Sequence, residues 1–305
     1  MTLESDLLLD RRRLKRRLVV WRVAALLAAL AAVLSVADIA MPGRPHLARL
    51  SVTGVITENR RLTEAVDAIA KDDDVPALIV FVNSPGGSVA GGESLHDAIA
   101  RVAAKKPVVA VMGGTAASAG YMVSLPAARI FARDSTITGS IGVLMETGEV
   151  SGLLGKLGIT AEAITSGPLK DQPSFIRPLT PEGKDVLHGL VMDLYEQFVG
   201  MVAAGRRMPV ETVRKLADGR AYTGHQALAL GLVDQIGGEP EARAWLAKEH
   251  QISAALPVED VEIGSLTERA LGGRFGSLLD VIEKTLSLQR VTIDGAWALW
   301  QPSGR

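Results

Sequence analysis

Two glycine-rich turns carry the residues with the clearest chemical potential. Residues 83–87 (Asn-Ser-Pro-Gly-Gly) follow an apolar run at 77–82, and residues 113–120 (Gly-Gly-Thr-Ala-Ala-Ser-Ala-Gly) follow another at 107–112. Loops at the carboxyl ends of parallel strands are where α/β proteins place their sites. Small residues in such turns let a peptide backbone approach closely, and their N–H groups can stabilise a developing negative charge. The two turns are therefore candidate positions for a nucleophile and for groups that stabilise an oxyanion.

Ser118 in the second turn is the candidate nucleophile. A serine near the start of a helix is most often a cap, but the glycine and alanine residues around it exceed what a cap needs. Gly86 and Gly87 are candidate oxyanion donors, although a tight turn after a proline explains them equally well. A phosphate-binding loop is a weaker interpretation, because the chain lacks a Walker pattern and the glycine spacing differs from a dinucleotide fingerprint.

A serine nucleophile needs a base. No histidine lies between His96 and His188, the interval that contains Ser118, and no pattern marks a more distant one as a triad member. Lysine is the alternative base, and it must be largely buried, with a lowered pKa, in order to accept a proton. Lys170, in the segment Ser-Gly-Pro-Leu-Lys-Asp at 166–171, is the candidate, although its spacing alone also fits a surface lysine.

The composition excludes several other classes of site. The chain has 305 residues, no cysteine, and 33 basic against 34 acidic residues. The absence of cysteine excludes a disulfide framework, a thiolate zinc site and a cysteine nucleophile. The near-zero net charge argues against a dedicated nucleic-acid binder.

The charge is unevenly distributed, and its distribution predicts a membrane anchor. Residues 1–17 form a basic stub, and 18–40 form an apolar segment that is long enough to span a bilayer. Arg22 lies close enough to the basic end to reach the interface. The basic stub predicts a cytoplasmic N-terminus, which places the remaining chain outside the cytoplasmic membrane. A cleaved signal peptide, with Ser-Val-Ala at 35–37 as the cleavage site, and a buried soluble helix are the alternatives.

Beyond a linker at 41–47, strands and helices alternate, which predicts an α/β fold with parallel strands. Strands are predicted over 48–56, 77–82, 107–112, 129–132 and 160–164, and helices over 60–70, 88–104, 116–125, 153–157, 181–206 and 210–217. Residues 251–305 have a mixed pattern, with a predicted helix at 276–287 and an apolar end at 296–300. That end could pack on a neighbouring subunit or lie near the substrate groove.

The two turns and three further segments together resemble the signal peptide peptidase SppA family. The further segments are Thr-Gly-Ser-Ile-Gly-Val at 138–143, the segment around Lys170, and Asp-Gly-Arg-Ala-Tyr-Thr-Gly at 218–224, followed by Gly-Leu-Val-Asp at 231–234. Each segment is weak evidence alone, but five in this order are specific. The resemblance covers residues 48 to 238 and implies the ClpP/crotonase fold: repeated ββα units with a mostly parallel sheet, here preceded by one N-terminal transmembrane helix.

The resemblance also implies roles for individual residues. Ser118 matches the nucleophile and Lys170 the general base of a Ser–Lys dyad. Gly86 or Gly87 matches one oxyanion donor, and Ala119, where the family usually has glycine, matches the other. The expected organisation is a peptidase domain at 48–250 with a C-terminal extension at 251–305. A ring-shaped homo-oligomer of the short form is implied, without metal, cofactor or nucleic acid.

The implied activity is that of a single-pass serine endopeptidase of the bacterial cytoplasmic membrane. It would degrade cleaved signal peptides and other apolar peptides on the outer, periplasmic or extracytoplasmic, side. The alternatives are a ClpP-type protease, which needs a histidine downstream of its serine, an acyl-CoA hydratase-like enzyme, and a non-catalytic membrane scaffold with the same fold.

Overall fold

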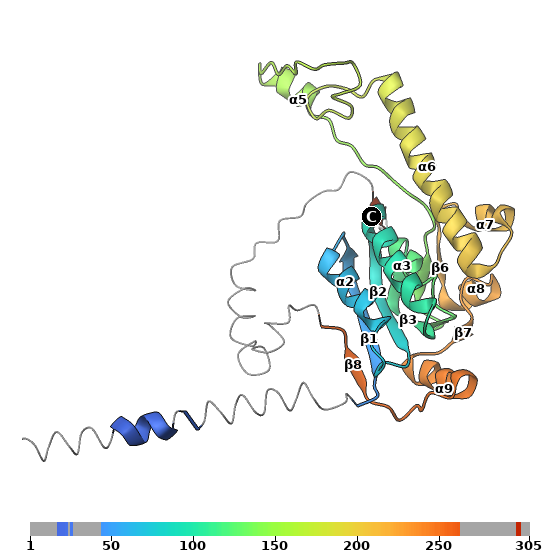
Figure 1. Ribbon diagram of the computed structural model, residues 1–305. Coiled ribbons are helices and arrows are strands. Elements are labelled where there is room, and N and C mark those ends of the chain that lie inside the picture. The colour runs from blue at the N-terminus through green and yellow to red at the C-terminus, as the bar shows by residue number, and fades with distance from the viewer. Residues whose placement is uncertain (1–16, 24, 27–43, 263–296, 300–305) are drawn as a thin grey trace, which may run out of the picture. The chain divides into compact units, whose positions relative to one another are not determined.

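The computed structural model describes residues 17–23, 25–26, 44–262 and 297–299 (Figure 1). Residues 1–44 and 45–305 form two units, and each is treated by itself. In the first, the described residues are helical, and most of the anchor predicted over 18–40 lies outside them. The helix predicted over 276–287 also lies outside them. No described helix has the length and apolar character needed to cross a membrane.

A mixed, mostly parallel sheet forms the centre of the second unit. Its strands follow the order β6-β5-β3-β2-β1-β8, while β4 pairs with β3 and β7, and β9 pairs with β2. Among the described strands, only the β5–β6 and β2–β9 pairs are antiparallel. The strands are β1 (Leu47–Ile56), β2 (Leu78–Ser88), β3 (Val108–Ala117), β4 (Arg129–Ala132), β5 (Ile137–Gly139), β6 (Ala221–Thr223), β7 (Gln235–Ile236), β8 (Val258–Asp260) and β9 (Trp297–Leu299). The predicted α/β class is confirmed.

Polar side chains cap the beginning of several helices. Asn59, Ser88 and Thr180 each adopt an extended conformation and accept a hydrogen bond from a backbone N–H three residues later, at 3.0 to 3.2 Å. The helices are α2 (Arg60–Ile69), α3 (Val89–Ala103), α4 (Ala119–Met122), α5 (Ser151–Lys156), α6 (Pro181–Arg206), α7 (Val210–Leu216), α8 (Gly224–Ala229) and α9 (Glu239–His250).

The central strands are buried on both faces. Alternate residues of β2, such as Leu78 and Val80, belong to the larger core, which includes residues of α2, α3, α4 and α6. Ile79 belongs to a smaller core on the other face, together with Ala242 and Leu246 of α9. Coverage on both faces explains why these strands are continuous apolar runs and not alternating ones.

Two predicted elements are wrong. The helix predicted over 116–125 is shortened to α4, because β3 continues through Ala116 and Ala117, which pair with β5. The strand predicted over 160–164 is irregular, and the side chain of Ile164 is 99% exposed. Its β-branched residues lack a neighbouring strand, and β propensity depends on such packing.

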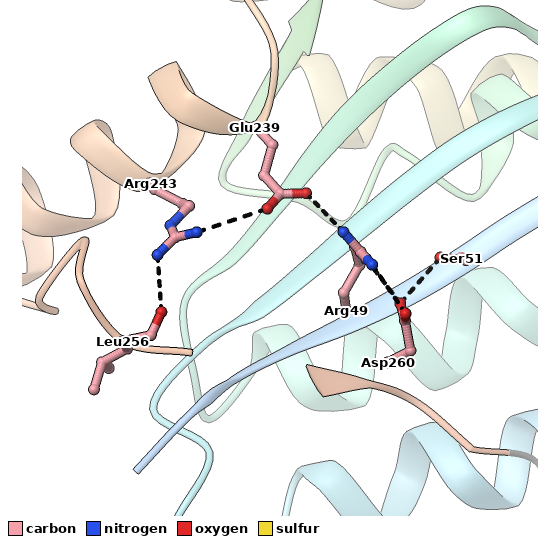
Figure 2. Close-up of polar contacts among 6 residues, drawn as sticks. All are labelled: Arg49, Ser51, Glu239, Arg243, Leu256 and Asp260. Carbon is pink, nitrogen blue, oxygen red and sulfur yellow. Dashed lines mark hydrogen bonds and ion pairs between the residues drawn. The ribbon is translucent and has the colours of Figure 1, made fainter. Parts of the chain in front are cut away.

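The sheet also includes a strand beyond residue 250, where the sequence predicted an extension of unclear role. Figure 2 shows how Arg49 of β1 holds β8: its guanidinium donates to Asp260 at 2.7 and 2.9 Å and to Glu239 of α9 at 3.2 Å. Arg243 lies 3.9 Å from Glu239 and donates to the carbonyl oxygen of Leu256 at 2.8 Å. The Arg49 guanidinium lowers the pKa of the Asp260 carboxyl. These contacts fasten the chain after α9 to the edge of the sheet.

Residues 143–180, which we call the arm and which include α5, project away from the sheet together with the first turns of α6 (Figure 1). The arm exposes many large apolar side chains: Leu144, Val150, Leu153, Leu157, Ile159, Ile164, Leu169 and Phe175. An exposed apolar surface of this extent marks an interaction site.

A buried ion pair anchors the other end of α6. Arg206, with a side chain only 8% exposed, donates to both carboxylate oxygens of Asp234 at 2.6 and 2.9 Å and to the carbonyl of Gly231 at 2.9 Å. Asp234 also accepts the N–H of Ile130 in β4 at 2.8 Å. The pair therefore ties the end of α6 to β4 of the sheet.

We expect Arg206→Met to lower the free energy of unfolding by about 3 kcal/mol, because the substitution leaves Asp234 without its partner. The matched control is Arg214→Met, which breaks an exposed pair with Glu196 and should cost less than about 1 kcal/mol. Urea denaturation of the two variants measures the difference. Equal losses would contradict the anchoring role of Arg206.

Candidate active site

Ser118 occupies a strained backbone position between β3 and α4. Its φ of 55° and ψ of −120° lie in a region that residues other than glycine rarely adopt, at a cost of about 1–3 kcal/mol. Its N–H donates to the carbonyl of Gly139 at 2.8 Å, and its carbonyl accepts the N–H of Met122 at 2.9 Å. The surrounding strands thus hold Ser118 in a backbone conformation that is unfavourable for a serine.

The Ser118 side chain is buried and has no hydrogen-bond partner among the described residues. The residue is 1% exposed, and Oγ neither caps α4 nor meets another polar atom there. An unsatisfied buried hydroxyl costs about 1–3 kcal/mol. The cap interpretation from the sequence is therefore wrong, and strain combined with an unpaired hydroxyl is typical of a functional residue.

Side chains of neighbouring strands fix the turn that carries Ser118. Asn83, in the middle of β2, accepts the N–H of Thr115 at 3.2 Å. Thr138 of β5 donates to the carbonyl of Ala116 at 2.7 Å. A Cβ atom at Gly120 would lie 2.9 Å from the carbonyl oxygen of Ser84, so glycine is required for this close approach. The glycine-rich segments 83–87, within β2, and 113–120, at the end of β3 and the start of α4, are therefore held against each other.

The structure distinguishes the two candidate oxyanion glycines. Gly86 has a φ of 115°, and its N–H donates to Ser84 Oγ at 3.1 Å, so it is already engaged within the turn. A Cβ atom at Gly87 would lie only 1.8 Å from the carbonyl oxygen of Ile56. Both positions require glycine for backbone reasons, and the N–H of Gly86 already has a partner within the chain. Ala119, the other candidate, begins α4 directly after Ser118.

Lys170 lies in the arm and is exposed. Figure 1 shows the segment between α5 and α6, which contains Lys170, projecting away from the sheet, and Ser118 Oγ has no hydrogen-bond partner among the described residues. The burial expected of a neutral lysine is absent. The next residue, Asp171, is paired with Arg177, whose guanidinium lowers the pKa of that carboxyl.

The sequence did not single out several residues that shape the site. Ser140 is nearly buried at a φ of 49°, and its N–H donates to the carbonyl of Arg220 at 2.9 Å. Tyr222 packs on Gly139, where a Cβ atom would lie 2.6 Å from the ring. Tyr121 donates to the carbonyl of Leu232 at 2.8 Å, and burial raises the pKa of its phenol. Ser140 and Tyr222 lie in the segments at 138–143 and 218–224, which carry the family resemblance but in which the sequence assigned no role to an individual residue.

The chemistry of the site also depends on whether metal-ligating side chains gather near it. In the part of the chain that the structure describes, no group of three or more histidine, aspartate or glutamate side chains could hold a metal ion. The chemistry available at the site is that of a serine hydroxyl beside backbone N–H groups.

The chain is similar to a known peptidase family and to several proteins assigned as proteases. The model of Peptidase family S49 matches residues 100–253. A protein of Synechocystis sp., assigned as a protease, is 40% identical over 227 residues, which cover 74% of this chain and 80% of that protein. An Enterococcus faecium protein, assigned as a signal peptide peptidase SppA, is 37% identical over 229 residues, covering 70% and 66% of the two chains.

Among solved structures, a ClpP1 mutant from Listeria monocytogenes is similar, with a TM-score of 0.42 and 21% identity over 62% of this chain and 91% of that chain. The family match and the identity to the Synechocystis protein are decisive: the chain belongs to peptidase family S49 and is a serine peptidase homologous to the signal peptide peptidase SppA.

Proposed function

We propose that the protein is a Ser–Lys endopeptidase that degrades cleaved signal peptides and other apolar peptides at the outer side of the bacterial cytoplasmic membrane. The observation that carries this proposal is Ser118 itself, which is strained, buried and without a hydrogen-bond partner beside a glycine turn. A buried hydroxyl in this state is suited to receive a base and a substrate carbonyl.

The proposed reaction uses Ser118, Lys170 and two backbone N–H groups. Neutral Lys170 removes the proton from Ser118 Oγ, which attacks the peptide carbonyl carbon. The N–H groups of Gly87 and Ala119 stabilise the oxyanion. The tetrahedral intermediate then collapses, and Lys170 donates its proton to the leaving amine. The same lysine then removes a proton from water, which attacks the ester carbonyl. The lysine returns this proton to Ser118 Oγ as the second product leaves with a free carboxyl group.

We propose that Lys170 reaches Ser118 from a neighbouring subunit of a ring-shaped homo-oligomer. Two observations support this arrangement: the arm that carries Lys170 projects from its own sheet, and it exposes a series of apolar side chains. Packing of the arm against the next subunit would bury this surface and remove the lysine from water. Burial would in turn favour the neutral lysine that the mechanism requires.

The membrane location is proposed from the sequence. The basic stub at 1–17 and the apolar segment at 18–40 predict a single-pass anchor with a cytoplasmic N-terminus. This anchor would hold the peptidase domain close to the lipid surface, where cleaved signal peptides are released.

Ser118→Ala and Lys170→Ala should each lower kcat at least about 10³-fold, because each removes one half of the dyad. The assay is cleavage of a quenched fluorescent signal peptide by the detergent-solubilised full chain. Lys184→Ala, at an exposed position in the first turn of α6, is the matched control and should retain activity. Activity near the wild-type level in either dyad variant would refute the proposed mechanism.

Mixed oligomers test whether the dyad is shared between subunits. When Ser118→Ala and Lys170→Ala subunits assemble at random in equal amounts, about a quarter of the sites combine an intact serine with an intact lysine from the neighbour. Co-expression with two affinity tags and tandem purification should therefore restore about a quarter of the wild-type activity. A fully inactive mixed assembly would show that each chain forms its own dyad.

The hydroxyl of Ser118, which has no hydrogen-bond partner among the described residues, should lower the free energy of unfolding. In a Lys170→Ala background, Ser118→Ala should raise the free energy of unfolding by about 1 kcal/mol, because it removes an unsatisfied buried hydroxyl. Ser88→Ala provides the opposite control, since it removes the cap of α3 and should lower stability by about 1 kcal/mol. Urea denaturation measures both, and a loss of stability in Ser118→Ala would mean that the hydroxyl is satisfied.

A further inference from the structure

A surface cavity beside the last turns of α6, which we call the α6 cavity, lies outside the site described above. Its volume of about 720 Å³ is within the range of pockets that hold small molecules. Its wall combines residues of α3, residues 125–128 between α4 and β4, residues 200–201 and 204–207 at the end of α6, and Asp234. Neither Ser118 nor Lys170 is among the described residues that line it. The α6 cavity is therefore a second candidate site.

Most of the wall of the α6 cavity is apolar. Nine of its thirteen lining residues have no polar group in their side chains. At Gly205, α6 lies close against the wall, because an added Cβ atom would be 2.9 Å from Leu125 Cβ. At Gly200, an added Cβ atom would meet no heavy atom within 4 Å, so open space remains beside the helix. A ligand that fits this wall has an apolar body.

One positive charge in the wall is uncompensated. The ionisable lining residues are His96, Arg206, Arg207 and Asp234. Arg206 donates to both carboxylate oxygens of Asp234, so these two charges compensate each other. His96 Nδ1 lies 2.9 Å from a carboxylate oxygen of Asp97. The Arg207 guanidinium has no hydrogen bond or ion pair with any residue in the part of the chain that the structure describes. Arg207 is therefore available to an anionic ligand.

The backbone of Arg207 supplies an independent observation. Arg207 ends α6 in the left-handed region, with a φ of 53°, and its N–H donates to the carbonyls of Ala203 and Ala204. Glycine is the usual residue where a helix ends in this conformation, because it adopts a positive φ without a steric penalty. The chain thus places an unpaired guanidinium in the cavity wall at a position where its own backbone favours glycine.

We propose that the α6 cavity binds a carboxylate attached to an apolar chain. Arg207 holds the carboxylate, which matches the planar guanidinium with two parallel hydrogen bonds. The wall around Gly200 and Leu125 holds the apolar chain. A phosphate dianion is a poorer match, since the negative end of the α6 dipole opposes a second negative charge and only one uncompensated cation lines the cavity.

Two kinds of molecule share this ligand chemistry: a free fatty acid and the C-terminus of an apolar peptide. Both occur where apolar peptides and lipids meet. The cavity does not include Ser118, so this inference is independent of the proposed peptidase function.

Isothermal titration calorimetry with sodium octanoate tests the role of Arg207 in the detergent-solubilised Ser118→Ala full chain. Octanoate should bind about tenfold more tightly than octanamide, because the amide lacks the charge that pairs with the guanidinium. Arg207→Gly, which suits the left-handed backbone, should raise the Kd of octanoate about tenfold. The matched control is Arg61→Gln, at an exposed arginine of α2 outside the cavity wall, which should leave the Kd unchanged.

Filling the cavity is a second test that leaves Arg207 in place. Gly200→Phe should raise the Kd of octanoate at least about tenfold, because the ring takes the space of the apolar chain. Gly189→Phe is the matched control: it also lies in α6, an added Cβ atom there also meets no heavy atom within 4 Å, and it is not in the cavity wall. Equal Kd values in all these proteins, or equal Kd values for octanoate and octanamide, would overturn the proposal. Loss of the native assembly in Gly200→Phe, measured by size-exclusion chromatography, would also overturn it, since a second copy of the chain would then cover the cavity.

A peptide probe distinguishes the two sources of the carboxylate. The probes are N-acetyl-trileucine with a free carboxyl group and the same peptide with a C-terminal amide. Binding of the peptide acid that is lost in Arg207→Gly would support a peptide C-terminus as the ligand, and binding of octanoate alone would support a fatty acid. Failure of both acids to bind the Ser118→Ala protein would overturn the proposal. Because cleavage by intact Ser118 is measured separately, this result leaves the proposed peptidase function unaffected.

Discussion

The structure of the site depends on one constraint, the positive φ of Ser118. Pairing of β3 with β5 carries the chain up to Ala117, and α4 begins at Ala119, so the single residue between them must absorb the change of direction. The hydrogen bond from the Ser118 N–H to Gly139 fixes this change. The Gly139 turn depends in turn on the ring of Tyr222, which leaves no space for a side chain. Three separate segments of the chain therefore determine the direction of one hydroxyl group.

The two halves of the proposed dyad lie in parts of the molecule with different physical properties. Ser118 belongs to a body whose strands are covered on both faces, and its burial follows from that packing. Lys170 belongs to an arm whose apolar side chains are exposed. A buried lysine would be costly to maintain in a single chain. In the proposed assembly, an exposed arm would avoid that cost in the monomer and would couple the proposed activity to the meeting of two subunits.

The end of the chain is integrated into the sheet more closely than its composition indicates. Arg49 joins β8 to the edge strand through Asp260 and joins it to α9 through Glu239 (Figure 2). β9 then pairs at the glycine turn, at the opposite end of β1 and β2. Exposed strand edges attract other chains, and both C-terminal strands cover such edges.

The sequence by itself determined the parallel α/β core, because continuous apolar runs at 77–82 and 107–112 fit only strands buried on both faces. It also determined the peptidase family, because five short motifs occur in the family's order. It did not determine the strand at 258–260, the true extent of α4 or the irregular course of 160–164, since each depends on whether a distant strand is available for pairing. Only the tertiary structure decided that Ser118 is strained and unpartnered, that the N–H of Gly86 is already engaged, and that Lys170 lies on a projecting arm. The physical reason is that burial, strain and hydrogen-bond satisfaction arise from contacts between segments far apart in the chain, which local residue patterns do not specify.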